Sequence, residues 1–238
     1  MNKNKLSIVD ISLDTKLSFL KTIESIINQK NKNFEIIVVD GGSKDGTAEE
    51  ILKMKNIFSN YLIEKDKGIY DAMNKGINYA SGNWIIFLNS GDTLFNSETI
   101  DYLLNEDLIN YDIVFGDTIV KNNNLEYLMY SNYFNNKCVQ MPFCHQSSMV
   151  KSNILKSIKF NLNYRLSADF NFFYECLMMN KIFFNLNKTI SVVEGGGVSD
   201  KQRQRVFSEN IKILKNNGKK NVIYKIYFIK FTQLLKDF

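Results

Sequence analysis

Short apolar runs alternate with amphipathic segments along the first ninety residues. Runs of the kind found in strands buried on both faces of a parallel sheet occupy 6–11, 34–39, 61–63 and 84–88. Helices are expected between them: one with Leu17, Leu20, Ile23 and Ile27 on its apolar face, one beginning near Thr47 and one over 70–80. This alternation predicts an α/β fold with a Rossmann-like, mostly parallel sheet flanked by helices.

The second half of the chain has a less regular pattern. Strands are expected at 111–115, 118–120, 125–129, 182–184 and 189–193, with a hairpin over 118–129, and helices at 97–106, 168–179 and 200–217. No internal repeat and no long linker divides the chain. We therefore expect one domain over 1–218, with halves 1–96 and 97–218, followed by a basic amphipathic helix over 219–238.

Composition narrows the class of protein. With 238 residues, 45% of them hydrophobic, the chain can bury a substantial core. The net charge of +5 suits a nucleotide or an anionic membrane surface but is too weak to indicate nucleic acid. Three cysteines and one histidine lack metal-ligand spacing, so reduced thiols in a cytosolic protein are expected. Neither a signal peptide nor a membrane-spanning run is visible.

Acidic residues follow three of the predicted strands, at the sheet edge where open α/β folds bind ligands. Asp40 and Gly41 could meet a nucleobase or ribose, or Asp40 could only cap a turn; both interpretations stay open. Asp66 and Lys67 could contact base, ribose and phosphate, or form an ordinary charged turn. Asp92 ends the most apolar run and could hold a hard divalent cation on a diphosphate, or only form an Asx-type turn. Three such loops together favour a nucleotide site over coincidence.

These stretches resemble glycosyltransferase family 2, whose members have the GT-A fold. VVDGGSKDGT at 38–47 is similar to the nucleotide-binding signature, EKDKGIYDAMNKGI at 64–77 to the next block, and FLNSGD at 87–92 to the metal-binding Asp-x-Asp region. The likeness is specific over about the first hundred residues. A looser likeness, through FCHQS at 143–147 and EGGGVS at 194–199, extends to about residue 200 and resembles small bacterial polysaccharide-biosynthesis members.

The resemblance implies roles for individual residues. The nucleotide-binding set would be Asp40, Gly41, Asp66, Lys67, Asn89 and Ser90, and Asp92 would hold Mn²⁺ or Mg²⁺ on the diphosphate. The first acidic position of the Asp-x-Asp region is Asn89 here, which carries no charge, so whether metal affinity is weakened stays open. The first half would then be the nucleotide-binding half and the second the acceptor half.

The resemblance also implies an inverting displacement, with a carboxylate as general base at the start of a helix in the second half. Asp169 stands at that position and is the expected base, with Ala168 where the family often has glutamate. A helix-terminal acid favoured by the dipole is the alternative. His145 could touch acceptor or phosphate, or be a satisfied polar residue. Arg203 could clamp a diphosphate, or lie on a solvated helix face.

The expected function is transfer of a hexosyl or N-acetylhexosaminyl group from a nucleotide-diphosphate sugar, UDP-linked, to a glycan or polyprenyl-linked acceptor in capsule, exopolysaccharide or lipopolysaccharide synthesis. No nucleic-acid partner is expected, and a homodimer stays open. The expected location is cytoplasmic, with peripheral contact on the inner face of the cell membrane left open, because 219–238 could lie in an interface or pack on protein. Two rivals are a non-catalytic nucleotide-sugar-binding partner and a sugar-nucleotide pyrophosphorylase, against which the glycine-free segment 6–15 counts.

Overall fold

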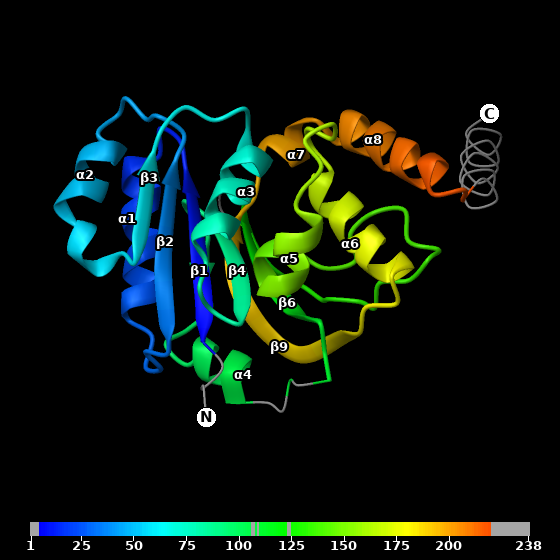
Figure 1. Cartoon of the computed structure of the whole chain (residues 1–238), viewed down its shortest axis with the longest axis horizontal. Helices are drawn as coiled ribbons and strands as arrows, with labels where there is room; N and C mark the ends of the chain where they lie inside the picture. The colour runs from blue at the N-terminus through cyan, green and yellow to red at the C-terminus, as the bar shows by residue number, and fades with distance from the viewer. Residues whose placement is uncertain (1–4, 106–107, 109, 123–124, 220–238) are drawn as a thin grey trace.

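The computed structural model describes residues 5–105, 108, 110–122 and 125–219. Within these residues nine strands form one sheet, in the order β3-β2-β1-β4-β8-β6-β9-β5, with β7 paired to β6 (Figure 1). The strands are β1 (Leu6–Ser12), β2 (Phe34–Asp40), β3 (Asn60–Ile63), β4 (Trp84–Asn89), β5 (Thr93–Leu94), β6 (Ile113–Asn122), β7 (Leu125–Met129), β8 (Ser148–Lys151) and β9 (Phe183–Glu194).

The two halves of the chain meet at the β4–β8 pair. Strands β3, β2, β1 and β4 are mutually parallel, as the apolar runs predict. Strand β8 then runs antiparallel to both β4 and β6, and β6 is parallel to β9. The predicted α/β class is confirmed. Because β1, β2 and β4 are parallel and adjacent, their carboxyl ends deliver residues 12, 40 and 89 to one edge of the sheet.

Helices cover both faces of this sheet. They are α1 (Lys16–Ile27), α2 (Thr47–Lys53), η1 (Lys55–Ile57), α3 (Ile69–Tyr79), α4 (Thr99–Asn105), η2 (His145–Ser147), α5 (Ser152–Ile158), α6 (Ala168–Met178), α7 (Val198–Lys201) and α8 (Arg203–Asn216). One buried cluster joins α3, α5, α6 and α8 to one face, and a second joins α1, α2 and α4 to the other. Alternate residues of β1 serve the two clusters: Val9 belongs to the first and Ile8 to the second.

The predicted apolar face of α1 is wrong in part. Ile23 is fully buried as expected, but Leu17 is 75% exposed and Ile27 is 40% exposed. The buried face is formed instead by Phe19, Thr22, Ile23 and Ile26. Thr22 belongs to this face because its hydroxyl bonds the turn after β4, a tertiary contact that a hydrophobic pattern cannot register.

Other segments differ from the predicted pattern in their boundaries. The two short strands expected at 111–115 and 118–120 are one strand, β6, which continues through an irregularity around Asp117. Those expected at 182–184 and 189–193 likewise join as β9. The helix expected over 200–217 is divided into α7 and α8, and β8 and α5 were not predicted. Residues 220–238 of the predicted C-terminal helix lie outside the described residues.

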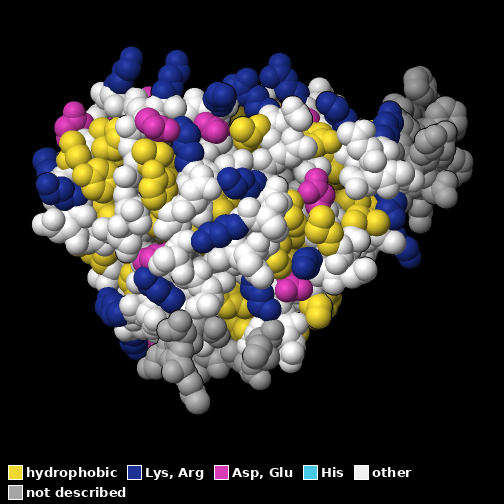
Figure 2. All heavy atoms as spheres, in the orientation of Figure 1, with side chains coloured by type: hydrophobic (Ala, Val, Ile, Leu, Met, Phe, Trp, Pro, Cys, Tyr) yellow, Lys and Arg dark blue, Asp and Glu magenta, His cyan; other side chains and the backbone are white. Residues whose placement is uncertain are grey.

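Two surface properties bear on function. Within the described ranges, every helix is too short or too polar to cross a lipid bilayer. On the face drawn in Figure 2, basic side chains are spread among acidic and apolar ones and do not form one continuous patch. That distribution agrees with the modest net charge of the chain.

Candidate active site

The turn that follows β4 is held by hydrogen bonds to α1 and to β1. Its closing bond runs from the Asp92 N–H to the Asn89 carbonyl at 2.8 Å, and Gly91 adopts a φ of 111°, a left-handed conformation that side chains disfavour. Thr22 of α1 accepts from the Gly91 N–H and donates to the Asp92 carbonyl, both at 2.8 Å. The Ser90 N–H bonds Ile11 of β1. The chain therefore presents Asp92 from a fixed backbone.

The carboxylate of Asp92 is buried, with only 6% of the residue exposed. Its Oδ2 accepts from the side-chain amide of Gln146 at 2.9 Å and from the Asn89 N–H at 3.3 Å, and its Oδ1 lies 3.4 Å from the Glu194 N–H. Burial raises the pKa of Asp92, and the bond from Gln146 and the charge of His145 act in the opposite direction. A further positive charge at the turn would therefore stabilise the ionised form of Asp92.

Asp10 is a second buried acid at the same edge, and the sequence analysis missed it. It is fully buried in β1, and Ser90 and Ser12 donate to its carboxyl group at 3.2 and 3.3 Å. Burial raises its pKa to about 8, with smaller contributions from the charges of Asp92 and Asp40. The available signal was a single charged residue within a mainly apolar strand.

Asp40 and Asp66 meet at Gly41. Asp40 is fully buried, and its carboxylate accepts from the backbone N–H groups of Gly42 and Ser43, so it shapes the loop after β2. A Cβ on Gly41 would lie 2.5 Å from Oδ2 of Asp66, so any side chain there would displace the Asp66 carboxylate. The carboxylate of Asp66 therefore packs on the Gly41 backbone, and its Oδ1 accepts from the Gly68 N–H at 2.8 Å. The structure brings these predicted nucleotide-binding residues together.

Two predicted cations lie at the surface. Lys67 is exposed, and its backbone N–H bonds Asp71. Arg203 begins α8, where its side chain is 81% exposed and its guanidinium lies 3.4 Å from Asp200. The predicted phosphate contacts of both residues stay predictions.

Asp169 is the second residue of α6. Its Oδ1 accepts from the Tyr70 hydroxyl and the Phe170 N–H, both at 2.8 Å, and its Oδ2 lies 3.5 Å from Nδ1 of His145. Burial raises the pKa of this carboxyl group, but the hydrogen bond and charge of His145 and the Tyr70 hydroxyl outweigh that effect and lower it overall. Asp169 is thus held as a carboxylate, with 18% of its side chain exposed.

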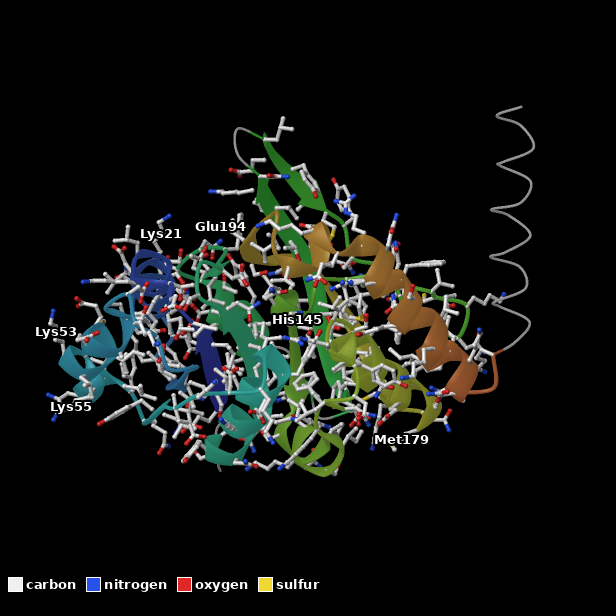
Figure 3. All side chains as sticks on the ribbon, turned by 90° about the horizontal axis from the view of Figure 1, so that it is seen from above. Lys21, Lys53, Lys55, His145, Met179 and Glu194 are labelled. Atoms are coloured by element: carbon white, nitrogen blue, oxygen red, sulfur yellow. The ribbon has the colours of Figure 1, made fainter. Side chains whose placement is uncertain are left out.

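The η2 turn lies between the two acids. Its first residue, His145, contacts Asp169, and its second, Gln146, contacts Asp92. Figure 3 shows His145 in the middle of the molecule, well away from Lys53 and Met179 at its outer edges. The buried Tyr70 and the partly buried Gln146 complete this group, and neither was predicted as a site residue. For Gln146 the signal was its position beside the only histidine in the sequence.

The oxygen atoms at the turn fit a hard divalent cation. Asp92 offers a carboxylate, and Oδ1 of Asn89 is buried without a hydrogen-bond partner among the described residues. Within the same residues no group of three or more His, Cys, Asp or Glu side chains is arranged to hold a metal. One carboxylate and one amide oxygen match the way Mg²⁺ is bound mainly by substrate phosphates and water. The phosphates of a bound nucleotide would therefore have to supply further ligands to any such ion.

The fold and the grouped acids define a GT-A type of transferase. The family model for glycosyl transferase family 2 matches residues 12–182. A "PGL/p-HBAD biosynthesis glycosyltransferase" of Mycobacterium bovis is 31% identical over 189 residues, covering 71% of this chain and 68% of the relative. An uncharacterized glycosyltransferase of Rickettsia bellii is 39% identical over 82 residues, 12% of its length. The chain belongs to glycosyltransferase family 2 and is an enzyme of that family.

Solved structures share the fold at low sequence identity. S. aureus TarS 1–349 in complex with UDP-GlcNAc gives a TM-score of 0.66 at 19% identity, covering 83% of this chain and 61% of that one. Another TarS crystal structure gives 0.65, and this chain spans 36% of it. The mannosyltransferase PcManGT from Pyrobaculum calidifontis, in complex with GDP-Man and Mn²⁺, gives 0.60 at 13% identity. These likenesses confirm the predicted GT-A fold.

Proposed function

We propose that the enzyme transfers a sugar from a nucleotide-diphosphate sugar, with inversion, and that Asp92 and Asp169 serve opposite sides of the transferred sugar. The observation that carries this proposal is the η2 turn, which contacts both acids through adjacent side chains. One acid lies at the strand edge that binds nucleotides in open α/β folds, and the other begins a helix of the second half. The proposal therefore places the donor on the Asp92 side of this group and the acceptor on the Asp169 side.

Asp169 is the proposed general base. Its low pKa leaves it ionised at neutral pH, and the Tyr70 hydroxyl and the His145 imidazole direct its two oxygens. As the acceptor hydroxyl oxygen bonds the anomeric carbon, its proton passes to Asp169. The bond from that carbon to the diphosphate oxygen breaks on the opposite face, which inverts the centre.

Asp92 and Asn89 are the proposed oxygen ligands of Mn²⁺ or Mg²⁺. When bound, such an ion neutralises the charge that grows on the leaving diphosphate. Asp40, Gly41 and Asp66 form the proposed floor of the nucleoside site, where the absence of a side chain at Gly41 lets Asp66 approach the backbone. The backbone of Ser90 would lie at the same edge.

The donor is proposed to be UDP-linked. TarS has been solved with UDP and with UDP-GlcNAc, which supports uridine. The PcManGT complex with GDP-Man shows that the same fold also accommodates guanosine, so the donor nucleotide must be tested directly. The acceptor is proposed to be a glycan or lipid-linked glycan in bacterial capsule, exopolysaccharide or lipopolysaccharide synthesis, with a peripheral membrane contact.

A thermal-shift and slow-hydrolysis screen tests the donor and the metal together. The protein is mixed with UDP-, GDP- or dTDP-sugars, each with Mn²⁺, with Mg²⁺ or with a chelator. We expect UDP-sugars to raise Tm only when a divalent ion is present, because the buried Asp92 carboxylate would otherwise face the diphosphate charge. Equal stabilisation in chelator would contradict the role given to Asp92.

The variant Asp169→Asn tests the base. It should bind donor and metal as the parent does but lose roughly 100- to 10,000-fold in transfer rate, the usual contribution of a positioned base. Asp200→Asn, an exposed acid of the same half, is the matched control and should keep full activity. Normal transfer by Asp169→Asn would place the base elsewhere.

A further inference from the structure

The turn η2 makes contacts that the roles of the two acids do not by themselves explain. Gln146 donates from Nε2 to Asp92 at 2.9 Å, while Nδ1 of the preceding residue, His145, lies 3.5 Å from Asp169. We propose that η2 sets the two acids relative to each other, with His145 as the positioning residue for Asp169 and Gln146 as that for Asp92. This inference rests on the proposed function and deepens it.

The turn itself is firmly anchored in the sheet. Ser147 is fully buried, and its Oγ lies 2.7 Å from the Thr118 hydroxyl of β6 and 2.6 Å from the Ser191 hydroxyl of β9. At the start of β8, the Ser148 hydroxyl donates to the His145 carbonyl at 2.7 Å. Three strands therefore hold η2, and this anchoring fixes the backbone of the two residues that precede Ser147, His145 and Gln146.

The amide of Gln146 is fixed at both ends. Burial raises the pKa of the Cys144 thiol to about 12, so it stays protonated at neutral pH. The thiol lies 2.7 Å from Oε1 of Gln146 and donates to it. That contact assigns Oε1 to the cysteine and leaves Nε2 as the donor to Asp92.

Only one of the two ring nitrogens of His145 has a polar partner among the described residues. Its Nδ1 points to Asp169, whereas its Nε2 is buried and has no hydrogen-bond partner within the described part of the chain. A buried histidine serving only stability would be expected to satisfy both nitrogens. Here the polar contact of the ring is made with Asp169, which indicates that His145 orients that carboxylate.

The imidazole also sets the charge state of Asp169. Several elements contribute titratable or charged groups to the surroundings of Asp169. They are His145 and Cys144 at η2, Tyr70 of α3, Asp92 after β4 and Glu209 of α8. The imidazole supplies the hydrogen bond and the charge that lower the pKa of Asp169 most. Its removal should raise that pKa, so the acid limb of kcat/KM should move to higher pH.

The experiment compares His145→Ala, His145→Asn and Gln146→Ala with Gln140→Ala, an exposed glutamine of the preceding loop. His145→Ala should lose about 10- to 100-fold in kcat, shift the acid limb upward and leave the KM for donor within about twofold. His145→Asn, whose amide can replace the Nδ1–H, should recover most of the rate. Gln146→Ala should instead weaken donor and metal binding, measured by calorimetry, and Gln140→Ala should match the parent.

Several outcomes would overturn the inference. An unshifted acid limb in His145→Ala, or an equal loss in His145→Ala and His145→Asn, would remove the positioning role. Folding is checked by circular dichroism and Tm for each variant. If Asp169→Asn remains active, the proposed base is wrong; if it is inactive while His145→Ala behaves normally, only the inference about η2 fails.

A spectroscopic readout is independent of activity. His145 is the only histidine, so its imidazole ¹⁵N resonances are unambiguous once any purification tag is removed. Asp169→Asn should move the Nδ1 resonance, because a hydrogen bond to a carboxylate is exchanged for a weaker one to an amide. An unchanged resonance would show that the contact between His145 and Asp169 does not form in solution.

Discussion

Asp10 illustrates how one side chain can couple the candidate site to stability. Its carboxyl group is fully buried beneath the turn that carries Asp92, and it accepts from the hydroxyl groups of Ser12 and Ser90. A carboxylate that is desolvated to this extent favours its protonated form, which explains a pKa of about 8. The strand tolerates an acid here because the acid can remain neutral.

The variant Asp10→Asn should therefore change the pH dependence of folding. The unfolded chain releases this proton near pH 3.8 and the folded chain near pH 8, so the parent's unfolding free energy falls as pH rises between these values. The slope is at most about 1.4 kcal/mol per pH unit. Urea unfolding at about pH 5 and about pH 7.5 measures this effect. The unfolding free energy of Asp10→Asn, relative to that of the parent, should be greater at the higher pH.

The control for this measurement is Asp200→Asn, an exposed acid. It should show the same pH dependence as the parent. A stability difference between Asp10→Asn and the parent that is equal at both pH values would contradict the raised pKa of Asp10.

At the level of elements, α8 fixes the start of α6. The carboxylate of Glu209 accepts from three successive backbone N–H groups, those of Arg165, Leu166 and Ser167, at 2.9 to 3.1 Å. These residues immediately precede α6, whose second residue is Asp169. An acid at a helix N-terminus is also favoured by the helix dipole. A residue of α8 thus anchors the segment that leads into the helix carrying the proposed base.

Glu209→Ala should loosen that helix start. Loss of the three bonds is expected to cost about 1–3 kcal/mol of unfolding free energy. Transfer should fall roughly tenfold while donor affinity stays unchanged, because the base shifts but the nucleotide edge does not. Chemical unfolding, kcat and donor Kd measure these effects, with the exposed neighbour variant Ser208→Ala as control. A loss of donor affinity equal to the loss of kcat would argue against a local effect.

At the scale of the whole molecule, the site is formed where two differently built halves join. The parallel half contributes the turn after β4, and the second half contributes η2 and α6. The join is the antiparallel pairing of β8 with both β4 and β6, which places η2, the residues just before β8, against the end of β4. Neither half holds both acids.

The sequence by itself determined the parallel half and the acids at its edge. Its central strands β1, β2 and β4 are buried on both faces, so they appear as mainly apolar runs, and parallel strands must bring Asp40 and Asp92 to one edge. The start of α6 at Ala168 was also predictable from its pattern, and so was Asp169 as a candidate base from the family resemblance.

Only the tertiary structure decided which groups surround those acids. Strand β8 is four residues long and η2 three, too short for any periodicity to register. The contacts of His145 with Asp169 and of Gln146 with Asp92 span long stretches of sequence, as do the bonds from the segment before α6 to Glu209. Local pattern reports which face of an element is apolar, whereas the partner of a buried polar atom is set by long-range packing. That is why Asp92 and Asp169 were visible in the sequence, whereas Gln146, Tyr70 and Glu209 were not, and His145 was visible only without its partner.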